Sequence, residues 1–245
     1  MNVLPRLFYF FRTLPVSLPH NDLKQFKHKV LQFIWGDKRP RVNRSTLYTP
    51  RRKGGLGLLY LLKYFYAAQV AQLSRFHSQR QQAIWMIMES RSCRPSPISH
   101  LMWLPTNERP AILCPTLSLS LDIWDRLSRT HKFRSPHTPL APFLQNKTFT
   151  PGLTPQAFNW WTNKGLMRIA DLCDHKCMLS ERAMIDKYHM PSTEGYRFTQ
   201  LTHYIRTLAR KGDLSTSTPM EQLCRQYDKI KGHISVVYSI LSYVS

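Results

Sequence analysis

Apolar residues recur at helical spacing near the start of the chain. Residues 21–35 place five of them on one side of a helix: Leu23, Phe26, Val30, Phe33 and Ile34. Basic side chains occupy the other faces: Lys24, Lys27, His28 and Lys29. Asn21 is the expected N-cap. The pattern therefore predicts an amphipathic helix with a positively charged outer side.

A second helical pattern runs from Leu58 to about His77. Its apolar positions are Leu58, Leu61, Leu62 and Phe65, and Gln69, Gln72 and Arg75 share a different, polar side. The first half is apolar nearly all round, so we expect it to be buried on most sides. Residues 79–89 predict one more short helix.

The segment between these two helices, residues 36–55, has no sustained period. Glycine and proline interrupt it at Gly36, Pro40, Pro50, Gly54 and Gly55. We interpret it as an extended basic loop, with a possible short strand at residues 45–48.

Prolines mark the middle of the chain. Ten of the seventeen prolines fall between Pro95 and Pro155, and only residues 117–128 have an amphipathic helical pattern there. This composition favours an irregular linker region. The sequence thus predicts a basic helical domain at residues 1–90, a Pro-rich irregular linker region at 91–153 and a helical region at 154–245.

The last third returns to short helices with recognisable starts. Thr154 precedes Pro155, Ser180 precedes a helical run, and Thr218 with Glu221 forms an expected capping box. Two apolar stripes follow helical spacing, Phe198, Leu201, Ile205 and Leu208, and Ile234, Val237, Tyr238 and Leu241. We predict a mainly α fold of several short helices, without internal repeats.

Charge narrows the choice of partner. The 35 Lys and Arg residues exceed the 14 Asp and Glu residues by 21. Residues 1–82 carry fifteen of the basic residues and only Asp22 and Asp37 as acids, a net formal charge of +13. A polyanion is the simplest partner for such a surface, because its phosphates offset the self-repulsion.

Compartment and membrane association are constrained as well. Five cysteines at irregular spacing favour free thiols in a reducing compartment, either nuclear or cytoplasmic. The N-terminal residues carry Arg6 and Arg12 and lack a cleavage pattern, so we expect neither a signal peptide nor secretion. Residues 56–73 are barely long enough to span a bilayer, and three polar residues interrupt them, which makes a membrane partner unlikely.

Catalytic signatures are missing from the sequence. A nucleotidyl transferase needs paired carboxylates to hold two divalent cations, and the sequence has no Asp-Asp pair. Asp22, in the first turn of its helix, suits the helix dipole better than a metal. There is no nucleophile elbow and no phosphate-binding glycine loop, so we expect neither an enzyme by itself nor a cofactor or small-molecule substrate.

One short motif raises the possibility of zinc. Cys173, His175 and Cys177 lie together, but no second pair of ligands accompanies them. On a helix the two cysteines would share one face and serve packing. We favour this structural interpretation and predict no metal site.

The strongest binding signal is the basic run in residues 38–53, which we call the basic segment. It holds seven cations and no acid: Lys38, Arg39, Arg41, Arg44, Arg51, Arg52 and Lys53. Gly54 and Gly55 follow at once, and glycine lets backbone N–H groups approach a phosphate. A solvated loop or a nuclear localisation signal remains an alternative. Nearby aromatic residues could stack on bases, although we expect Trp35, Tyr60 and Tyr64 to pack in the core.

Several short motifs together resemble a known family. They are Leu4-Pro5-Arg6, Leu14-Pro15 with Leu18-Pro19, Phe33-Ile34-Trp35, the basic stretch through Arg44, Gly54-Gly55-Leu56-Gly57 and the cluster from Tyr64 to Ala68. In this order they resemble the segment after the palm in reverse transcriptases of LINE-type non-LTR retrotransposons. The resemblance covers residues 4–77 strongly and most of the rest loosely, through Met184 to Lys187 and Gly232 to Ser235.

The resemblance implies a helical thumb that holds a template and primer duplex by its backbone, followed by a helical connecting region. The family's endonuclease, its palm with the catalytic carboxylates and its Cys/His-rich segment have no counterpart in this sequence. Leu59 stands where the family often has proline, and Met1 falls where the family's chain is in mid-protein. We therefore expect a truncated or decayed copy.

Together these observations predict a non-catalytic fragment that binds RNA or an RNA–DNA hybrid without sequence specificity. Besides the basic segment, the expected contacts come from Lys24, Lys27, Gly54, Gly55 and Arg75. Two alternatives remain. The chain could complete an RNA-directed DNA polymerase whose palm is supplied elsewhere, or it could be a basic peripheral membrane or scaffold protein.

Overall fold

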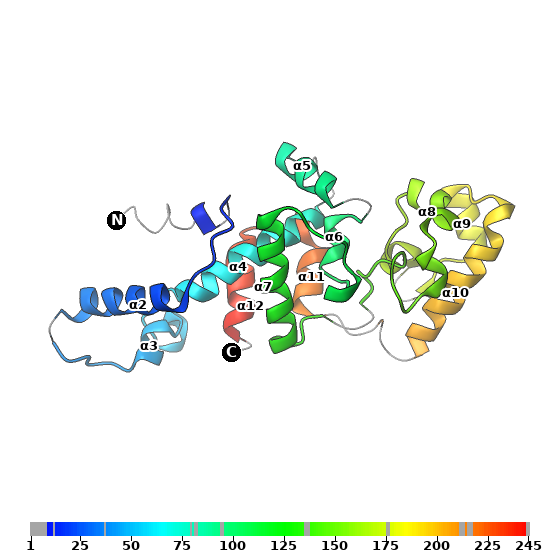
Figure 1. Cartoon of the computed structure of the whole chain (residues 1–245). Helices are drawn as coiled ribbons and strands as arrows, with labels where there is room; N and C mark the ends of the chain where they lie inside the picture. Colours follow the sequence, from blue (N-terminus) through cyan, green and yellow to red (C-terminus); the bar gives the residue numbers. More distant parts are fainter. Residues whose placement is uncertain are drawn as a thin grey trace. The chain divides into compact units, whose positions relative to one another are not determined.

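The computed structural model describes residues 9–11, 13–36, 38–78, 80, 83–93, 96–134, 138–174, 177–210, 214 and 218–243. The chain is mainly helical, as predicted (Figure 1). It divides into two compact units. Unit 1 comprises residues 1–72 and 232–245, and unit 2 comprises residues 73–231. This division differs from the three consecutive regions that the composition suggested, because the last helix joins the N-terminal residues.

Unit 1 contains the helices α2 (His20–Trp35), α3 (Arg44–Tyr48), η1 (Arg51–Lys53, a 3-10 turn) and α12 (His233–Tyr243), with most of α4 (Leu61–Ser74). The periodicities predicted α2, α4 and α12, and the structure confirms these three helices. Helix α2 begins after Pro19, one residue before the Asn21 that we expected as its cap.

The core of unit 1 forms around α4 and α12. The Phe11 and Phe65 rings pack edge to face with centroids 5.1 Å apart. Val237 and Leu241 of α12 are buried. The Tyr60 N–H donates a 3.0 Å hydrogen bond to the Tyr238 hydroxyl. Because each buried aliphatic or aromatic side chain contributes about 1.5–3 kcal/mol, α12 is an integral part of this unit.

Two side chains of unit 1 depart from the expected faces. Phe33 was assigned to the apolar side of α2 but is 80% exposed, since it lies at the edge of that stripe. Gln69 was assigned to a polar face of α4 but is fully buried, and its side-chain amide donates to the Phe11 carbonyl oxygen. That hydrogen bond removes the cost of burying the polar group.

Unit 2 is built from many short elements. Its helices include α5 (Ile84–Ser92), α6 (Ile98–Leu101), α7 (Pro115–His131), α8 (Asn159–Asn163), α9 (Glu181–Tyr188), α10 (Gly195–Arg210) and α11 (Pro219–Arg225). Its 3-10 turns include η2 (Arg75–His77), η3 (Thr106–Glu108), η4 (Thr150–Leu153), η5 (Pro155–Phe158), η6 (Ile169–Leu172), η7 (Ser192–Glu194) and η8 (Tyr227–Lys229). The predicted stripe of α10 is buried at Leu201, Ile205 and Leu208.

The Pro-rich middle, expected to be a linker, instead supplies much of the core of unit 2. Residues 101–104 are buried, and so is Trp124 on α7. The prolines mark helix starts: Pro97 precedes α6, Pro105 precedes η3 and Pro115 opens α7. Proline suits these positions because its missing N–H has no partner in the first turn.

A small hairpin replaces the helix considered for the two cysteines. β1 (Cys173–Asp174) pairs antiparallel with β2 (Cys177–Met178), with Asp174 opposite Cys177. The interpretation of a shared helix face is therefore wrong. His175 lies outside the described residues.

Two of the three predicted helix starts are confirmed by their hydrogen bonds. The Ser180 side chain accepts from the Ala183 N–H. Thr218 and Glu221 form the reciprocal capping box. Thr154 precedes η5, but its side chain makes no cap hydrogen bond.

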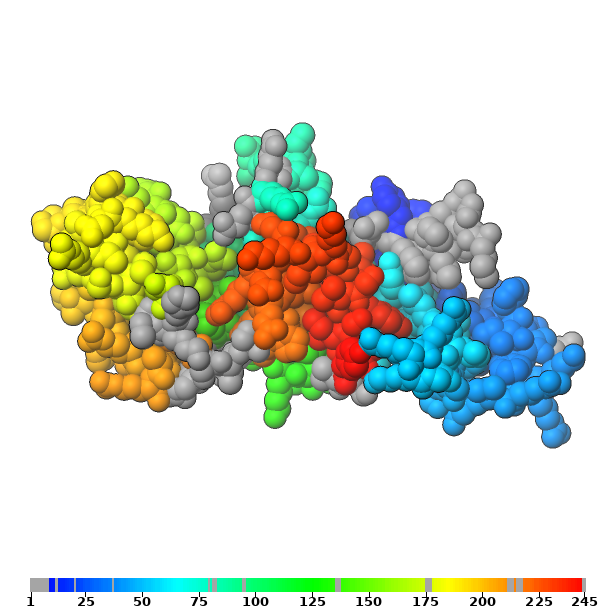
Figure 2. All heavy atoms as spheres, turned by 180° about the vertical axis from the view of Figure 1, so that it is seen from behind, coloured from blue at the N-terminus to red at the C-terminus, as the bar shows by residue number. Residues whose placement is uncertain are grey.

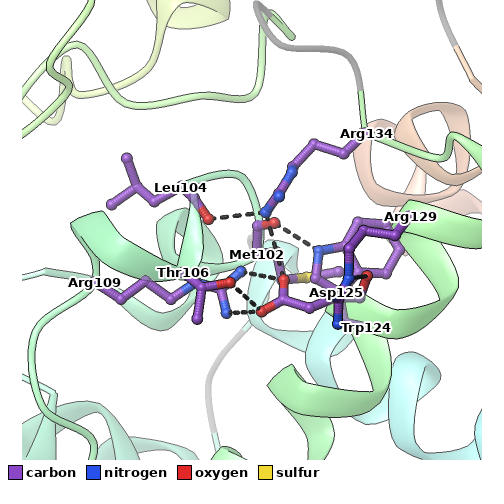
Figure 3. Close-up of polar contacts among 8 residues, drawn as sticks. All are labelled: Met102, Leu104, Thr106, Arg109, Trp124, Asp125, Arg129 and Arg134. Atoms are coloured by element: carbon purple, nitrogen blue, oxygen red, sulfur yellow. Dashed lines mark hydrogen bonds and ion pairs between the residues drawn. The ribbon is translucent and has the colours of Figure 1, made fainter.

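A buried ion cluster joins α7 to the preceding loop in unit 2 (Figure 3). The Asp125 carboxylate accepts from the Arg109 guanidinium group at 2.7 Å on each oxygen, from the Thr106 hydroxyl at 2.8 Å and from Arg134 at 3.4 Å. The Arg109 and Asp125 side chains are both nearly buried. With its acceptor positions filled from several sides, Asp125 has a structural role.

Candidate nucleic-acid interface

The basic segment is more ordered than an extended loop. Residues 38–43 run from the end of α2 to α3 (Figure 1), and the strand considered at residues 45–48 is the helix α3. The Asn43 side chain accepts from the Ser45 N–H at 3.1 Å and caps this helix. Leu47 is buried and anchors it. A five-residue helix is too short to show a period, so the strand prediction failed.

After α3 the backbone turns back on itself. The Leu56 N–H donates to the Thr46 carbonyl at 3.0 Å, and the Leu58 N–H donates to the Leu47 carbonyl at 2.7 Å. Gly54, with φ of +81°, allows the turn after η1. A Cβ at Gly55 would overlap the Thr49 carbonyl oxygen. The turn therefore requires glycine at position 55 for space.

The hydrogen bonds of this turn correct the role expected for the two glycines. The Gly54 N–H donates to the Arg51 carbonyl at 3.0 Å, and the Gly55 N–H donates to the Pro50 carbonyl at 3.2 Å. Both groups are thus used within the turn. The glycines shape the backbone that presents the cations, and phosphate contacts would come from side chains.

The cationic residues of the segment lie at the surface, although Arg51, Arg52 and Lys53 also make contacts within unit 1. All seven are exposed, and so is Lys24 on α2. Unit 1 as a whole has thirteen Lys and Arg residues and two Asp residues, a net formal charge of +11. Among the described residues, the ion pairs of the structure all lie in unit 2. The charge of the segment is therefore not offset by an ion pair within the described part of unit 1.

Lys27, predicted to contact phosphate, is engaged inside unit 1. Its Nζ donates to the Tyr60 hydroxyl at 2.9 Å and lies 4.6 Å from the centroid of the Tyr60 ring. The Tyr60 ring in turn packs edge to face on Tyr48, with centroids 5.2 Å apart. Lys27 consequently links α2 to Tyr60, which directly precedes α4 in the chain.

Arg75, the remaining predicted contact, does not belong to this unit. It begins η2 in unit 2, where its guanidinium carbon lies 5.2 Å from the centroid of the Trp85 ring. The predicted residues of α2 and of residues 38–55 therefore belong to unit 1, and Arg75 belongs to unit 2.

Two aromatic residues next to the candidate interface were not predicted as site residues, although Tyr238 was placed on an apolar stripe. Tyr238 lies against Tyr64, with ring centroids 6.3 Å apart. Tyr243 lies beside Arg52 and Lys53. The predicted core aromatics Trp35, Tyr60 and Tyr64 are half-buried. Both missed tyrosines come from α12, whose docking site on unit 1 has no local sequence signal.

Metal-binding and membrane-spanning features are not found in the described part of the chain. Asp22 lies in the first turn of α2, as predicted, and Asp37 lies outside the described residues. No three His, Cys, Asp or Glu residues among those described are grouped to hold a metal ion. No described helix is both long enough and apolar enough to cross a bilayer.

No protein-family model matches the chain.

Proposed function

We propose that unit 1 binds the sugar–phosphate backbone of RNA or of an RNA–DNA hybrid, without sequence specificity and without catalysis. The observation that carries this proposal is the set of exposed cations on the basic segment, which no described residue of unit 1 offsets with an ion pair. Arginine forks suit phosphate oxygens, and a set of phosphate contacts positions a nucleic acid without reading its bases.

The rigidity of the segment supports the proposal. Four of the cations, Arg44, Arg51, Arg52 and Lys53, extend from a capped helix and a hydrogen-bonded turn that hold the backbone in one arrangement. Fewer backbone torsions then have to be ordered on binding, which lowers the entropic cost. The resemblance of residues 4–77 to a retrotransposon thumb supports the same partner. The five cysteines at irregular spacing support a location inside the cell.

The first experiment measures binding of the purified chain to a labelled RNA–DNA hybrid across a salt series. The variant changes Arg39, Arg41, Arg44, Arg51 and Arg52 to Ala. Each lost phosphate contact should lower the slope of log K against log salt by about 0.7–0.9. We expect tight, salt-sensitive binding by the natural chain and a clearly shallower slope for the variant.

A matched control removes the same number of exposed cations from unit 2. It changes Lys147, Lys164, Arg182, Arg206 and Arg225 to Ala, all of which are exposed. The slope of this variant should stay close to that of the natural chain. An equal decrease of the slope in both variants would show that binding depends only on net charge, and it would contradict a localised interface.

Anionic phospholipid vesicles provide the competing surface. If the folded chain binds vesicles rather than the hybrid, the same cations serve a peripheral membrane protein and the proposal is wrong.

A further inference from the structure

A tyrosine distant in sequence lies directly against the basic segment. The Tyr243 ring centroid is 5.0 Å from the Lys53 Nζ and 5.7 Å from the Arg52 guanidinium carbon. Arg52 also donates a hydrogen bond to the Tyr243 hydroxyl. Figure 2 shows the red end of α12 lying against the blue segment that holds these cations.

The two tyrosines of α12 differ in their surroundings. Tyr238 is half-buried and accepts the Tyr60 N–H through its hydroxyl. Tyr243, one and a half turns later, is 59% exposed. Tyr238 therefore fixes the helix to the unit, whereas much of the Tyr243 ring is left to solvent.

The combination of an exposed ring and two adjacent cations favours one class of ligand. An acidic peptide would neutralise Arg52 and Lys53 but offers a flat surface for the ring only where it also carries an aromatic side chain. A nucleotide offers both, since its phosphates match the cations and the face of its base stacks on an aromatic side chain. Bases within a duplex already stack on their neighbours, so only an unpaired base has a face available.

We propose that Tyr243 stacks on an unpaired base while Arg52 and Lys53 hold the flanking phosphates. This inference rests on the proposed function and adds to it a preference for RNA that contains unpaired bases next to the gripped backbone. Stacking is tolerant of base identity, which agrees with binding that ignores sequence.

The test compares a single-stranded RNA with a fully paired hybrid, using the full chain and the variants Tyr243→Leu and Tyr243→Phe. Leucine removes the ring and should weaken single-strand binding about tenfold, within the range measured for base–aromatic stacking, while hybrid binding stays unchanged. Phenylalanine keeps the ring and should retain single-strand affinity although the hydrogen bond from Arg52 is lost.

A matched control is available in unit 2. Tyr196 is 69% exposed and has the Arg197 guanidinium carbon 5.5 Å from its ring centroid. Tyr196→Leu should leave both affinities unchanged. As a direct measurement, photocrosslinking with 5-iodouridine in the single strand should label the peptide that contains Tyr243.

The outcomes separate the two proposals. Salt-sensitive hybrid binding by the natural chain, with no selective loss of single-strand affinity in Tyr243→Leu and no crosslink to its peptide, overturns the stacking site and leaves the proposed function intact. An equal loss of single-strand and hybrid affinity in Tyr243→Leu gives Tyr243 a purely positioning role and also overturns the stacking site. Absence of binding by the folded natural chain to either nucleic acid overturns both proposals.

Discussion

The Arg109 guanidinium group and the Asp125 carboxylate meet in parallel, with two hydrogen bonds of 2.7 Å, inside unit 2. Both side chains are nearly buried, so neither charge is stabilised by bulk water. Removing one partner of such a pair leaves the other as an uncompensated buried charge, which costs about 3–5 kcal/mol.

We therefore expect Asp125→Ala to lower the free energy of unfolding of unit 2 by about 3–5 kcal/mol, measured by urea denaturation. Asp122→Ala changes an exposed carboxylate on the same helix and should stay within about 0.5 kcal/mol of the natural protein. Similar stabilities for the two variants would show that the cluster does not hold α7 in place.

Gly55→Ala should destabilise the turn that follows α3. The added methyl group would overlap the Thr49 carbonyl oxygen, and such overpacking costs about 1–3 kcal/mol. Hydrogen exchange reads this out locally, because the Leu56 and Leu58 N–H groups bond across the turn and should exchange faster in the variant. Gly195 has open space around it and negative φ, so Gly195→Ala should leave exchange at this turn unchanged.

Both Lys27 and Lys24 were predicted to contact phosphate, but we expect Lys27 to stabilise unit 1 and Lys24 to contribute to binding. Lys27→Ala removes the hydrogen bond and the cation–π contact with Tyr60 and should lower the stability of unit 1 by about 1–2 kcal/mol. Lys24 is exposed, and Lys24→Ala should leave stability within about 0.5 kcal/mol while weakening hybrid binding. Thermal unfolding measures the stability effect and the salt series measures the binding effect. A loss of stability in Lys24→Ala would contradict the role given to Lys24.

The free energy of unfolding should decrease as the pH is lowered, because two histidines are buried. Burial, with the nearby Arg168 charge, lowers the pKa of His77 from 6.5 to about 3 and that of His100 from 6.5 to about 4. Below about pH 6.5 these two histidines become protonated in the unfolded chain but stay neutral in the folded chain. Each histidine should then cost about 1.4 kcal/mol per pH unit, down to its folded pKa. His77 also accepts from the Trp103 indole N–H at 3.3 Å, a bond that protonation of the accepting nitrogen would break.

Urea denaturation between pH 6.5 and 5 checks this slope. The variant His100→Phe should show a shallower dependence than the natural chain, since one proton-binding site of the unfolded state is gone. His203→Gln alters an exposed histidine and should keep the natural slope. A natural chain whose stability is constant over this range would contradict the prediction.

Helices with a long apolar stripe could be predicted from the sequence. The spacing of Leu201, Ile205 and Leu208 located α10, and the capping box of Thr218 and Glu221 located the start of α11. Both signals are local, because they depend on residues within one or two helical turns. The sequence likewise located the exposed cations of residues 38–53.

Features that depend on tertiary contacts could not be predicted in this way. The prolines at 97, 105 and 115 suggested a linker, although each marks the start of a helix or a 3-10 turn. The contact between Arg52 and Tyr243 joins residues 191 positions apart. For α3 the Asn43 cap was the available signal, and in a five-residue helix it competes with the strand propensity of Thr46 and Tyr48.

The discontinuity of unit 1 has a consequence for biosynthesis. Residues 232–243, which complete this unit, leave the ribosome only after all of unit 2 has been made. Until then α4 lacks its partner α12, and Tyr60 lacks the hydroxyl of Tyr238. A ribosome that stops anywhere within unit 2 would release a cationic surface without its closing helix, so the unit that we propose to bind RNA becomes complete only when translation has passed through both units.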